Sequence, residues 1–348
     1  MNRRLTVAAR GVAIAVAGAV WFQSAFAQAP SVSGRASPTT AAAAPTGEAP
    51  RTPWGEPDLQ GIWTSEPELN VPFERAPEFG EREELTGQEF AARQTQAVRQ
   101  LQTDNAEFDL ESAETANAGA VGSATSPPPH WLERGTPSRR TSMVILPKNG
   151  RVPAQLPEAR NRGGRVGGSF GNGPFNGPTD FTLYDRCITR GVPNAMFPAI
   201  YNANTQIVQG PGVVAITHEM IHETRVIPIG SQPPLGAHMR QWLGDARAHW
   251  DGNTLVVESA NFSGRTNYRG SGVGLRLTER FTRVDGDDLR YEVTVRDPTT
   301  WATPWTAALN MKTQEQGMFE YACHEGNHAM RNMLSAARAS DAAPAARR

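Results

Sequence analysis

The second half of the chain holds a repeated strand-and-turn pattern, and this pattern constrains the fold more than any other feature. Thr254–Ser259 follows an Asp251-Gly252 turn. Leu275–Val284 and Leu289–Val295 flank an Asp285-Gly286 turn. Asp-Gly pairs are typical of tight hairpin turns. Apolar and polar residues alternate in the last of these segments, so one strand face is buried. The pattern predicts a mainly β protein, an antiparallel meander that forms a barrel-like or strongly curved sheet.

Further strands and a few short helices are expected around this pattern, joined by long loops. Met143–Leu146, Thr306–Lys312 and Phe319–Ala322 have the composition of additional strands. The Thr-Gly-Gln-Glu sequence at 86–89 is a capping box, in which a threonine hydroxyl and a glutamate bond the first turn of a helix. We therefore expect a helix over residues 86–103, with one apolar side.

The composition favours one folded domain with disordered ends. The 348 residues include 8 tryptophans, which a disordered chain rarely contains. Residues 28–52 are rich in alanine and proline and predict a disordered tether. Residues 53–335 predict a single β-rich domain, and residues 336–348 predict a disordered tail. The glycine-rich stretch 163–177 lacks the flanking strand and helix that a phosphate-binding loop needs, so we interpret it as an ordinary loop.

Residues 1–27 have the pattern of a secretory signal peptide. Three arginines lie among the first ten residues, and the apolar stretch Gly11–Phe22 is shorter than a membrane span. Ala25-Phe26-Ala27 fits a cleavage site, which disfavours the alternative of an uncleaved anchor. We expect a periplasmic or secreted protein that contacts no membrane after cleavage. The formal net charge of −1 gives the chain no electrostatic reason to bind nucleic acid.

The chain contains two cysteines, Cys187 and Cys323. In an oxidising compartment two such thiols form a disulfide. A catalytic or metal-binding thiolate is the alternative. The disulfide would join the middle of the domain to its C-terminal end, where it would hold the neighbouring side chains in place.

Four motifs spread along the chain are distinctive: PWGEPDLQGIW at 53–63, YDRCI at 184–188, QWLGD at 241–245 and YACHEGN at 321–327. Together they resemble a family of exported bacterial proteins to which no function is assigned. That resemblance covers the whole domain and implies a fold built mainly of strands, without implying an activity. Within the first motif, Gly61-x-Trp63 resembles the lipocalin signature. This second resemblance implies a lipocalin-like barrel.

The sequence His218-Glu219-Met220-Ile221-His222 satisfies the H-E-x-x-H pattern, which on a helix binds zinc through both histidines. The surrounding segment, Gly212–Ile227, is rich in β-branched residues, so we expect a strand instead. On a strand the two histidines are too far apart to share one metal. Glu219, Glu223 and Arg225 then lie on the opposite face. That face is either a solvated surface with a salt bridge or a polar barrel interior that holds a substrate.

Two further clusters contain candidate site residues. Residues 240–250 interleave tryptophan and arginine with acids, which suits a site that stacks a flat ring, although tryptophan in an ordinary core is the alternative. Residues 321–328 contain His324 and Glu325 beside a cysteine. A disulfide there would make His324 a rigidly held imidazole suited to proton transfer, whereas a surface or capping histidine is the alternative.

We therefore expect an exported enzyme that acts on a small organic molecule or a glycoside by acid–base chemistry of lyase or hydrolase type. The candidate catalytic residues are His222, His324, Glu219 and Glu325. The candidate substrate-binding residues are Arg225, Arg240, Trp242, Arg247, His249 and Trp250. No cofactor is expected, but a divalent metal would bind if the side chains of His222, His249 and His324 converge.

Two alternatives stay open. One is a non-catalytic, lipocalin-like protein that binds a small molecule in the barrel. The other is a zinc-dependent hydrolase or peptidase that uses the HEMIH motif. In all three cases the partner is a small molecule, and the sequence leaves its identity and the oligomeric state open.

Overall fold

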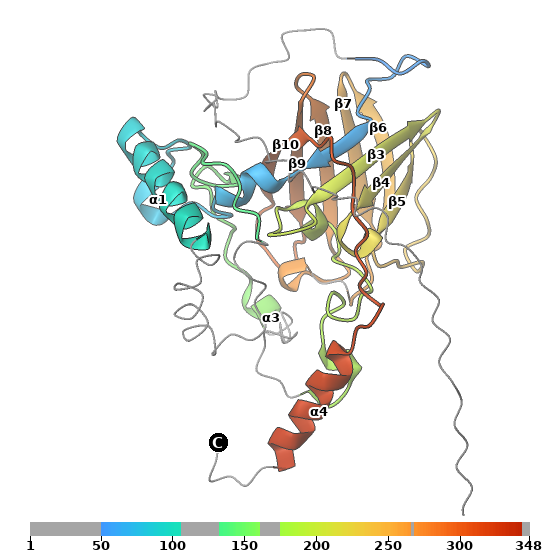
Figure 1. Cartoon of the computed structure of the whole chain (residues 1–348). Coiled ribbons are helices and arrows are strands. Elements are labelled where there is room, and N and C mark those ends of the chain that lie inside the picture. The colour runs from blue at the N-terminus through green and yellow to red at the C-terminus, as the bar shows by residue number, and fades with distance from the viewer. Residues whose placement is uncertain (1–49, 106–131, 161–174, 266–267, 343–348) are drawn as a thin grey trace, which may run out of the picture. The chain divides into compact units, whose positions relative to one another are not determined.

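The fold is mainly β, as the sequence predicts, and the computed structural model describes residues 50–105, 132–160, 175–265 and 268–342. Ten strands form one antiparallel sheet in the order β5-β4-β3-β1-β10-β9-β8-β7-β6, with β2 pairing β10 beside this path (Figure 1). The strands are β1 (Gly61–Thr64), β2 (Val144–Leu146), β3 (Asn204–Gly210), β4 (Val213–His218), β5 (Thr224–Pro228), β6 (Asp245–Asp251), β7 (Thr254–Ala260), β8 (Arg276–Arg283), β9 (Asp288–Arg296) and β10 (Trp305–Thr313).

The sheet consists of two meanders that β1 joins. β3, β4 and β5 pair in chain order, and so do β6 to β10. β1 lies between β3 and β10, so the first strand of the chain connects the two runs. The expected hairpin turns are present: Gly252 adopts a positive φ of 61° between β6 and β7, and the Asp285 carboxylate accepts the main-chain N–H groups of Asp287 and Asp288 between β8 and β9.

The sheet curls into a nearly closed barrel with one seam, between β5 and β6. Because nine strands alternate in direction along the path, its two end strands point the same way. The contact between them is accordingly parallel, and it consists of an isolated bridge between Ile229 and Ala248. The Gly230 N–H donates to the Ala248 carbonyl across this seam. Closure by a full antiparallel ladder would need an even number of strands in the path.

The inner face of the barrel holds most of the hydrophobic core. Along β9 every second residue is buried, and the same alternation continues on β8 and β4. Trp63 from β1 and Trp305 from β10 are fully buried within this core. Outside the barrel, β10 is also covered: the Arg140 guanidinium donates to the Ala308 carbonyl and forms an ion pair with Glu68.

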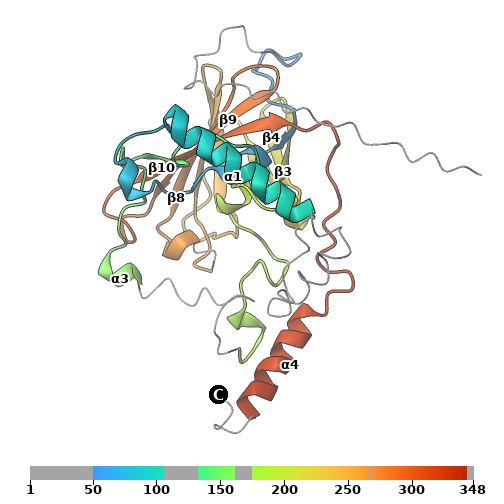
Figure 2. The same ribbon diagram turned by 60° about the vertical axis from the view of Figure 1, so that its left-hand side comes forward.

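In the described part of the chain, three α-helices lie outside the sheet: α1 (Gly87–Asn105), α3 (Pro157–Arg160) and α4 (Ala329–Ala342). The predicted capping box is present, since Thr86 and Glu89 exchange hydrogen bonds at the start of α1. Arg93 of α1 donates to the carbonyls of Ser138 and Arg140, which anchors the helix beside β10 (Figure 2). Among the described residues no helix combines the length and the apolar character needed to cross a membrane.

Two local predictions near the C-terminal end differ from the structure. Phe319–Ala322 forms no strand. Both edges of β10 are already paired, with β1 and β9. Phe319 instead donates its main-chain N–H to Glu219 in the β4–β5 connection. Residues 336–342 are helical as the second half of α4 rather than part of a disordered tail. All described residues belong to one compact unit, Thr39–Arg348. The signal-peptide segment, nearly all of the tether and the glycines at 163–173 lie outside the described residues.

Candidate functional site

The HEMIH motif forms a tight turn at one end of the barrel. β4 ends at His218, β5 begins at Thr224, and the residues between them reverse the chain. Ile221 and His222 adopt positive φ values of 67° and 44°, which are uncommon outside glycine. The expected single strand over Gly212–Ile227 is therefore wrong, because this segment is a hairpin. The zinc-binding helix is not formed either, since His218 ends a strand and residues 220–222 form a single short turn with non-helical backbone at Ile221.

We call this end of the barrel the β4–β5 end. It consists of the connections 219–223, 261–275 and 297–304 together with the first or last residues of the adjoining strands. Antiparallel pairing brings these connections to the same end, which is the lower end of the barrel in Figure 1.

A buried ion pair crosses the barrel interior close to this end. The Arg225 guanidinium on β5 donates two hydrogen bonds to the Glu279 carboxylate on β8, at 2.6 and 2.9 Å. The Tyr291 hydroxyl on β9 donates to the same carboxylate at 3.0 Å. Glu279 and Tyr291 are completely buried. Burial and the neighbouring Glu279 charge raise the pKa of Tyr291 well above its usual value, so the phenol stays protonated.

His218 lies at the end of β4 as a buried, neutral imidazole. Its Nδ1 is 3.2 Å from the Thr205 hydroxyl of β3. Burial, together with the positive charges of Arg225 and Arg190, lowers the pKa of His218 to about 3. The ring is therefore uncharged at neutral pH, and it takes part in hydrogen bonds rather than ion pairs.

Several buried polar atoms at the β4–β5 end have no hydrogen-bond partner among the described residues. On the strands they are the Nε2 of His218, the Nε of Arg225, the Oγ of Ser259 and the Nε1 of Trp305. In the connections they are the hydroxyl of Tyr268, the Oγ of Ser271 and the Nε1 of Trp301. An unsatisfied buried polar group costs about 1–3 kcal/mol. Seven of them would cost as much as the roughly 5–15 kcal/mol that stabilises an ordinary domain.

Aromatic side chains surround this set. Trp301 and Trp305 meet edge to face with centroids 5.9 Å apart. Phe73 packs against Trp305 at 5.9 Å and against Phe197 at 5.2 Å. Tyr268 lies 6.1 Å from Trp305. An aromatic wall with a few polar atoms is the usual lining of a small-molecule site.

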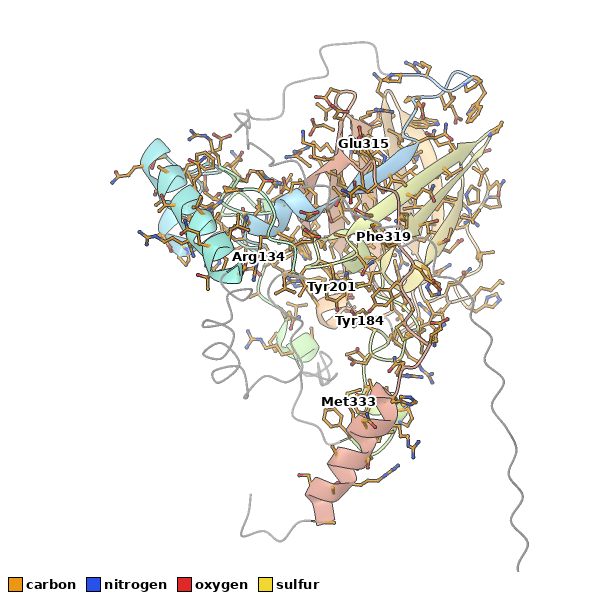
Figure 3. All side chains as sticks on the ribbon, in the orientation of Figure 1. Arg134, Tyr184, Tyr201, Glu315, Phe319 and Met333 are labelled. Atoms are coloured by element: carbon orange, nitrogen blue, oxygen red, sulfur yellow. A yellow bond between two sulfur atoms is a disulfide. The ribbon has the colours of Figure 1, made fainter. Side chains whose placement is uncertain are left out.

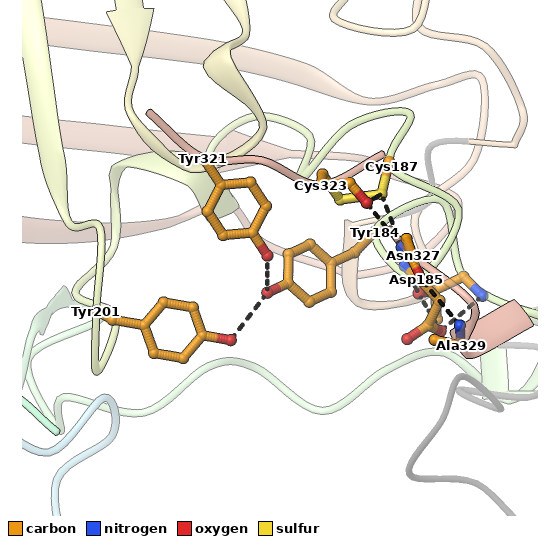
Figure 4. Close-up of a disulfide and its surroundings, with 9 residues drawn as sticks. Tyr184, Asp185, Cys187, Tyr201, Tyr321, Cys323, Asn327 and Ala329 are labelled. Atoms are coloured by element: carbon orange, nitrogen blue, oxygen red, sulfur yellow. Dashed lines mark hydrogen bonds between the residues drawn. A yellow bond between two sulfur atoms is a disulfide. The ribbon is translucent and has the colours of Figure 1, made fainter. Parts of the chain in front are cut away.

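A second polar group lies beside the β4–β5 turn, where three tyrosines from separate segments meet. The Tyr184 hydroxyl is 3.2 Å from that of Tyr201 (Figure 3) and 3.1 Å from that of Tyr321 (Figure 4). Burial and the contact with Tyr184 raise the pKa of Tyr201 to about 12. The Arg190 guanidinium lies 5.7 Å from the ring centroid of Tyr184. The tyrosines pack against Met220 and Ile221 of the turn.

The predicted disulfide between Cys187 and Cys323 is confirmed, and it fastens this tyrosine group together (Figure 4). It joins the segment that carries Tyr184 to the segment that carries Tyr321. The predicted catalytic residue Glu219 adds a second tie, because its carboxylate accepts the Phe319 N–H at 2.6 Å. Glu219 is buried, and its carboxylate is thus used to hold the C-terminal segment against the turn.

The other predicted catalytic residues, His222, His324 and Glu325, are all exposed. Their side chains form no hydrogen bond or ion pair with any residue that the structure describes. The disulfide and the apolar contacts bring the turn that carries His222 close to the segment that carries His324. Their catalytic role stays a prediction.

Of the predicted binding residues, only Arg225 and Trp250 lie on the inner face of the barrel. Trp250 follows Ala248 on the inner side of β6, near the end opposite the β4–β5 turn. His249 is on the outer face of the same strand, since strand neighbours alternate. The others lie outside the barrel: Arg240 donates to the carbonyls of Phe262 and Val273, Arg247 to Asp245 and Pro233, and Trp242 is exposed.

The conditional metal site is not formed. No three histidine, cysteine or acidic side chains gather into a metal-binding group anywhere in the described ranges. His222, His249 and His324 all belong to those ranges, so these three do not converge.

The sequence interpretation missed Glu279, Tyr291 and Arg190 as site residues. Glu279 gave a usable signal, because it occupies an apolar position between Leu277 and Phe281 in the alternation of β8. Burying a carboxylate at such an inward-facing position costs free energy unless a cationic side chain pairs with it. Arg190 gave no such signal, since its segment has no regular period.

Comparisons with protein-family models, with curated proteins and with solved structures found no match to this chain.

Proposed function

We propose that this protein binds a small organic molecule inside its barrel, at the β4–β5 end. The observation that carries the proposal is the set of buried polar atoms there without partners, on β4, β5, β7 and β10 and in two connections. Buried polar atoms almost always have a partner. A ligand, together with any water it brings, would supply the missing partners, and the adjoining aromatic rings would cover its apolar part.

We further propose that the protein is exported. The signal-like pattern of residues 1–27 and the disulfide Cys187–Cys323 support this proposal together, because disulfides persist in oxidising compartments.

Binding of a neutral fluorescent probe, N-phenyl-1-naphthylamine, tests the binding function. Ser259 is buried on the inner face of β7, while Thr278 lies on the outer face of the adjacent β8. We expect one saturable site per chain, detected by energy transfer from tryptophan. Ser259→Phe fills the interior and should weaken binding at least tenfold, whereas Thr278→Phe should leave the affinity within about twofold.

Circular dichroism and thermal unfolding of both variants show whether each retains the fold. A wild-type protein with no saturable probe binding would refute the proposal. So would a folded Ser259→Phe variant that binds the probe as tightly as Thr278→Phe does.

A catalytic function is our second proposal, supported by the presence of His218, Glu279 and Tyr291 in the same interior. These three provide a neutral imidazole, a carboxylate and a protonated phenol, the groups used in acid–base chemistry. Release of nitrophenol from p-nitrophenyl glycosides and esters, compared between wild type and His218→Gln, tests this set. His222→Ala and His324→Ala in the same assay test the residues predicted from the sequence.

A further inference from the structure

Arg190, beside the β4–β5 turn, has no counter-charge among the residues that the structure describes. It is half-buried, yet its guanidinium forms no ion pair or hydrogen bond with any residue that the structure describes. Its neighbour Thr189 donates to the Glu223 carboxylate at 2.7 Å, and the Arg190 main-chain N–H bonds the same carboxylate. The Glu223 carboxylate is therefore engaged by the Thr189 hydroxyl and by the main chain.

The surroundings of Arg190 are rich in hydrogen-bond donors. The hydroxyls of Tyr184, Tyr201 and Tyr321 carry three hydrogens, since burial raises the pKa of each phenol. The two contacts between these hydroxyls use two hydrogens. Each of these hydroxyls can donate a hydrogen bond, and the guanidinium beside them can only donate.

The barrel interior next to Arg190 has the same imbalance. The partnerless nitrogens of Arg225, Trp301 and Trp305 all carry hydrogens that can only be donated. Arg190 is near enough to this interior for its charge to act on His218. Both places, the barrel interior and the surroundings of Arg190, therefore lack a hydrogen-bond acceptor. Beside Arg190 the acceptor that fits best is negatively charged.

We propose that the ligand is an organic anion with an apolar body, and that Arg190 and the tyrosine group bind its anionic end. This inference rests on the proposed binding function and adds the chemical class of the ligand. The apolar body would lie against the aromatic side chains around Trp305, and the anionic end would face Arg190. A carboxylate, a sulfonate and a phosphate share the acceptor chemistry that this arrangement requires.

Two probes with one ring skeleton test the proposal. 8-Anilinonaphthalene-1-sulfonate carries a sulfonate, and N-phenyl-1-naphthylamine lacks it. We expect the disulfide-intact full chain to bind the sulfonate at least tenfold more tightly. A hydrogen-bonded charge pair typically changes affinity by about ten- to a hundredfold. Arg190→Gln should therefore weaken binding of the sulfonate by that factor and leave binding of the neutral probe within about twofold.

Arg283→Gln is the matched control. Arg283 also lies against an aromatic ring, 5.2 Å from the centroid of Trp63, but it is at the opposite end of the barrel, where it donates to the Asp285 and Gly286 carbonyls. Arg283→Gln changes the net charge by the same amount as Arg190→Gln. Because the change is far from the proposed site, it should leave the affinities for both probes unchanged. Arg190→Lys keeps the charge and should retain the preference for the sulfonate.

Three possible results distinguish failure of the anion proposal from failure of the binding function. If the wild type binds both probes equally, the anion proposal is overturned while the binding function stands. If Arg190→Gln weakens both probes equally, Arg190 supports the fold of the site and does not bind the anion, which also overturns it. If neither probe binds saturably, the binding function itself fails. The wild-type comparison decides the question even where Arg190→Gln does not fold.

Discussion

The ion pair between Arg225 and Glu279 yields the sharpest quantitative prediction. Glu279→Gln removes the counter-charge but keeps the shape, which leaves a guanidinium buried without a partner charge. Removing one member of a buried pair costs about 3–5 kcal/mol, because the remaining charge keeps its desolvation penalty. We expect the free energy of unfolding to fall by that amount, and Arg225→Met to cost about as much, since it leaves the Glu279 carboxylate with Tyr291 alone.

Removing the whole network should cost much less. The triple variant Arg225→Met, Glu279→Leu and Tyr291→Phe replaces every polar member by an apolar one of similar size. Such replacements are often neutral or stabilising, so we expect its stability to lie within about 2 kcal/mol of wild type. The single losses would then fail to add, with a coupling of several kcal/mol between the sites.

Urea unfolding followed by tryptophan fluorescence measures these differences, provided that the slope of the free energy with denaturant is the same in all variants. Single variants that each cost less than about 1 kcal/mol would refute the argument, because a cost that small is typical of a solvated ion pair. The same would follow if the triple variant lost as much free energy of unfolding as Glu279→Gln and Arg225→Met lose together.

Two further predictions concern His218 and the disulfide. The pKa of His218 is lowered to about 3 in the folded state, below its value of about 6.5 when unfolded, so stability is lost as the pH falls through this range. Between pH 6 and pH 4 we expect wild type to lose about 2–3 kcal/mol more than His218→Gln; equal pH profiles would contradict this. Replacing Cys187 and Cys323 together by alanine opens a loop with a sequence separation of 136 and should cost about 4–5 kcal/mol, measured by denaturant unfolding. A loss below about 1 kcal/mol would contradict the second prediction.

Local sequence rules predicted much of the sheet. β7, β8 and β9 match their predicted segments to within one or two residues, and the capping box at Thr86 starts α1. These features depend on side-chain alternation and on turns between residues close in sequence. These local rules failed where contacts between residues far apart in the sequence decided the local structure. The β-branched run around the HEMIH motif indicated one strand, but the turn at Ile221 packs against tyrosines from three separate segments.

The candidate site was predicted less well than the sheet, for a physical reason. Sequence clustering selected His222, His324 and His249 because they lie in dense groups of polar residues, yet the fold leaves all three exposed. Arg225 was selected on a different basis, the cost of a charge in an apolar strand, and it does point into the barrel. The cost of burial is thus a better guide than the density of reactive residues.

The sequence by itself determined the antiparallel meander, the helix cap and the pairing of the two cysteines, because each depends on a local pattern or on there being a single choice of partner. Only the tertiary structure decided which residues face one another. Arg225 and Glu279 are on strands that are not neighbours in the sheet, and 54 residues separate them in the chain. Their contact exists because the sheet curls until β5 approaches β6. The same curl collects the partnerless donors of four strands at one end, beside a lone guanidinium at Arg190.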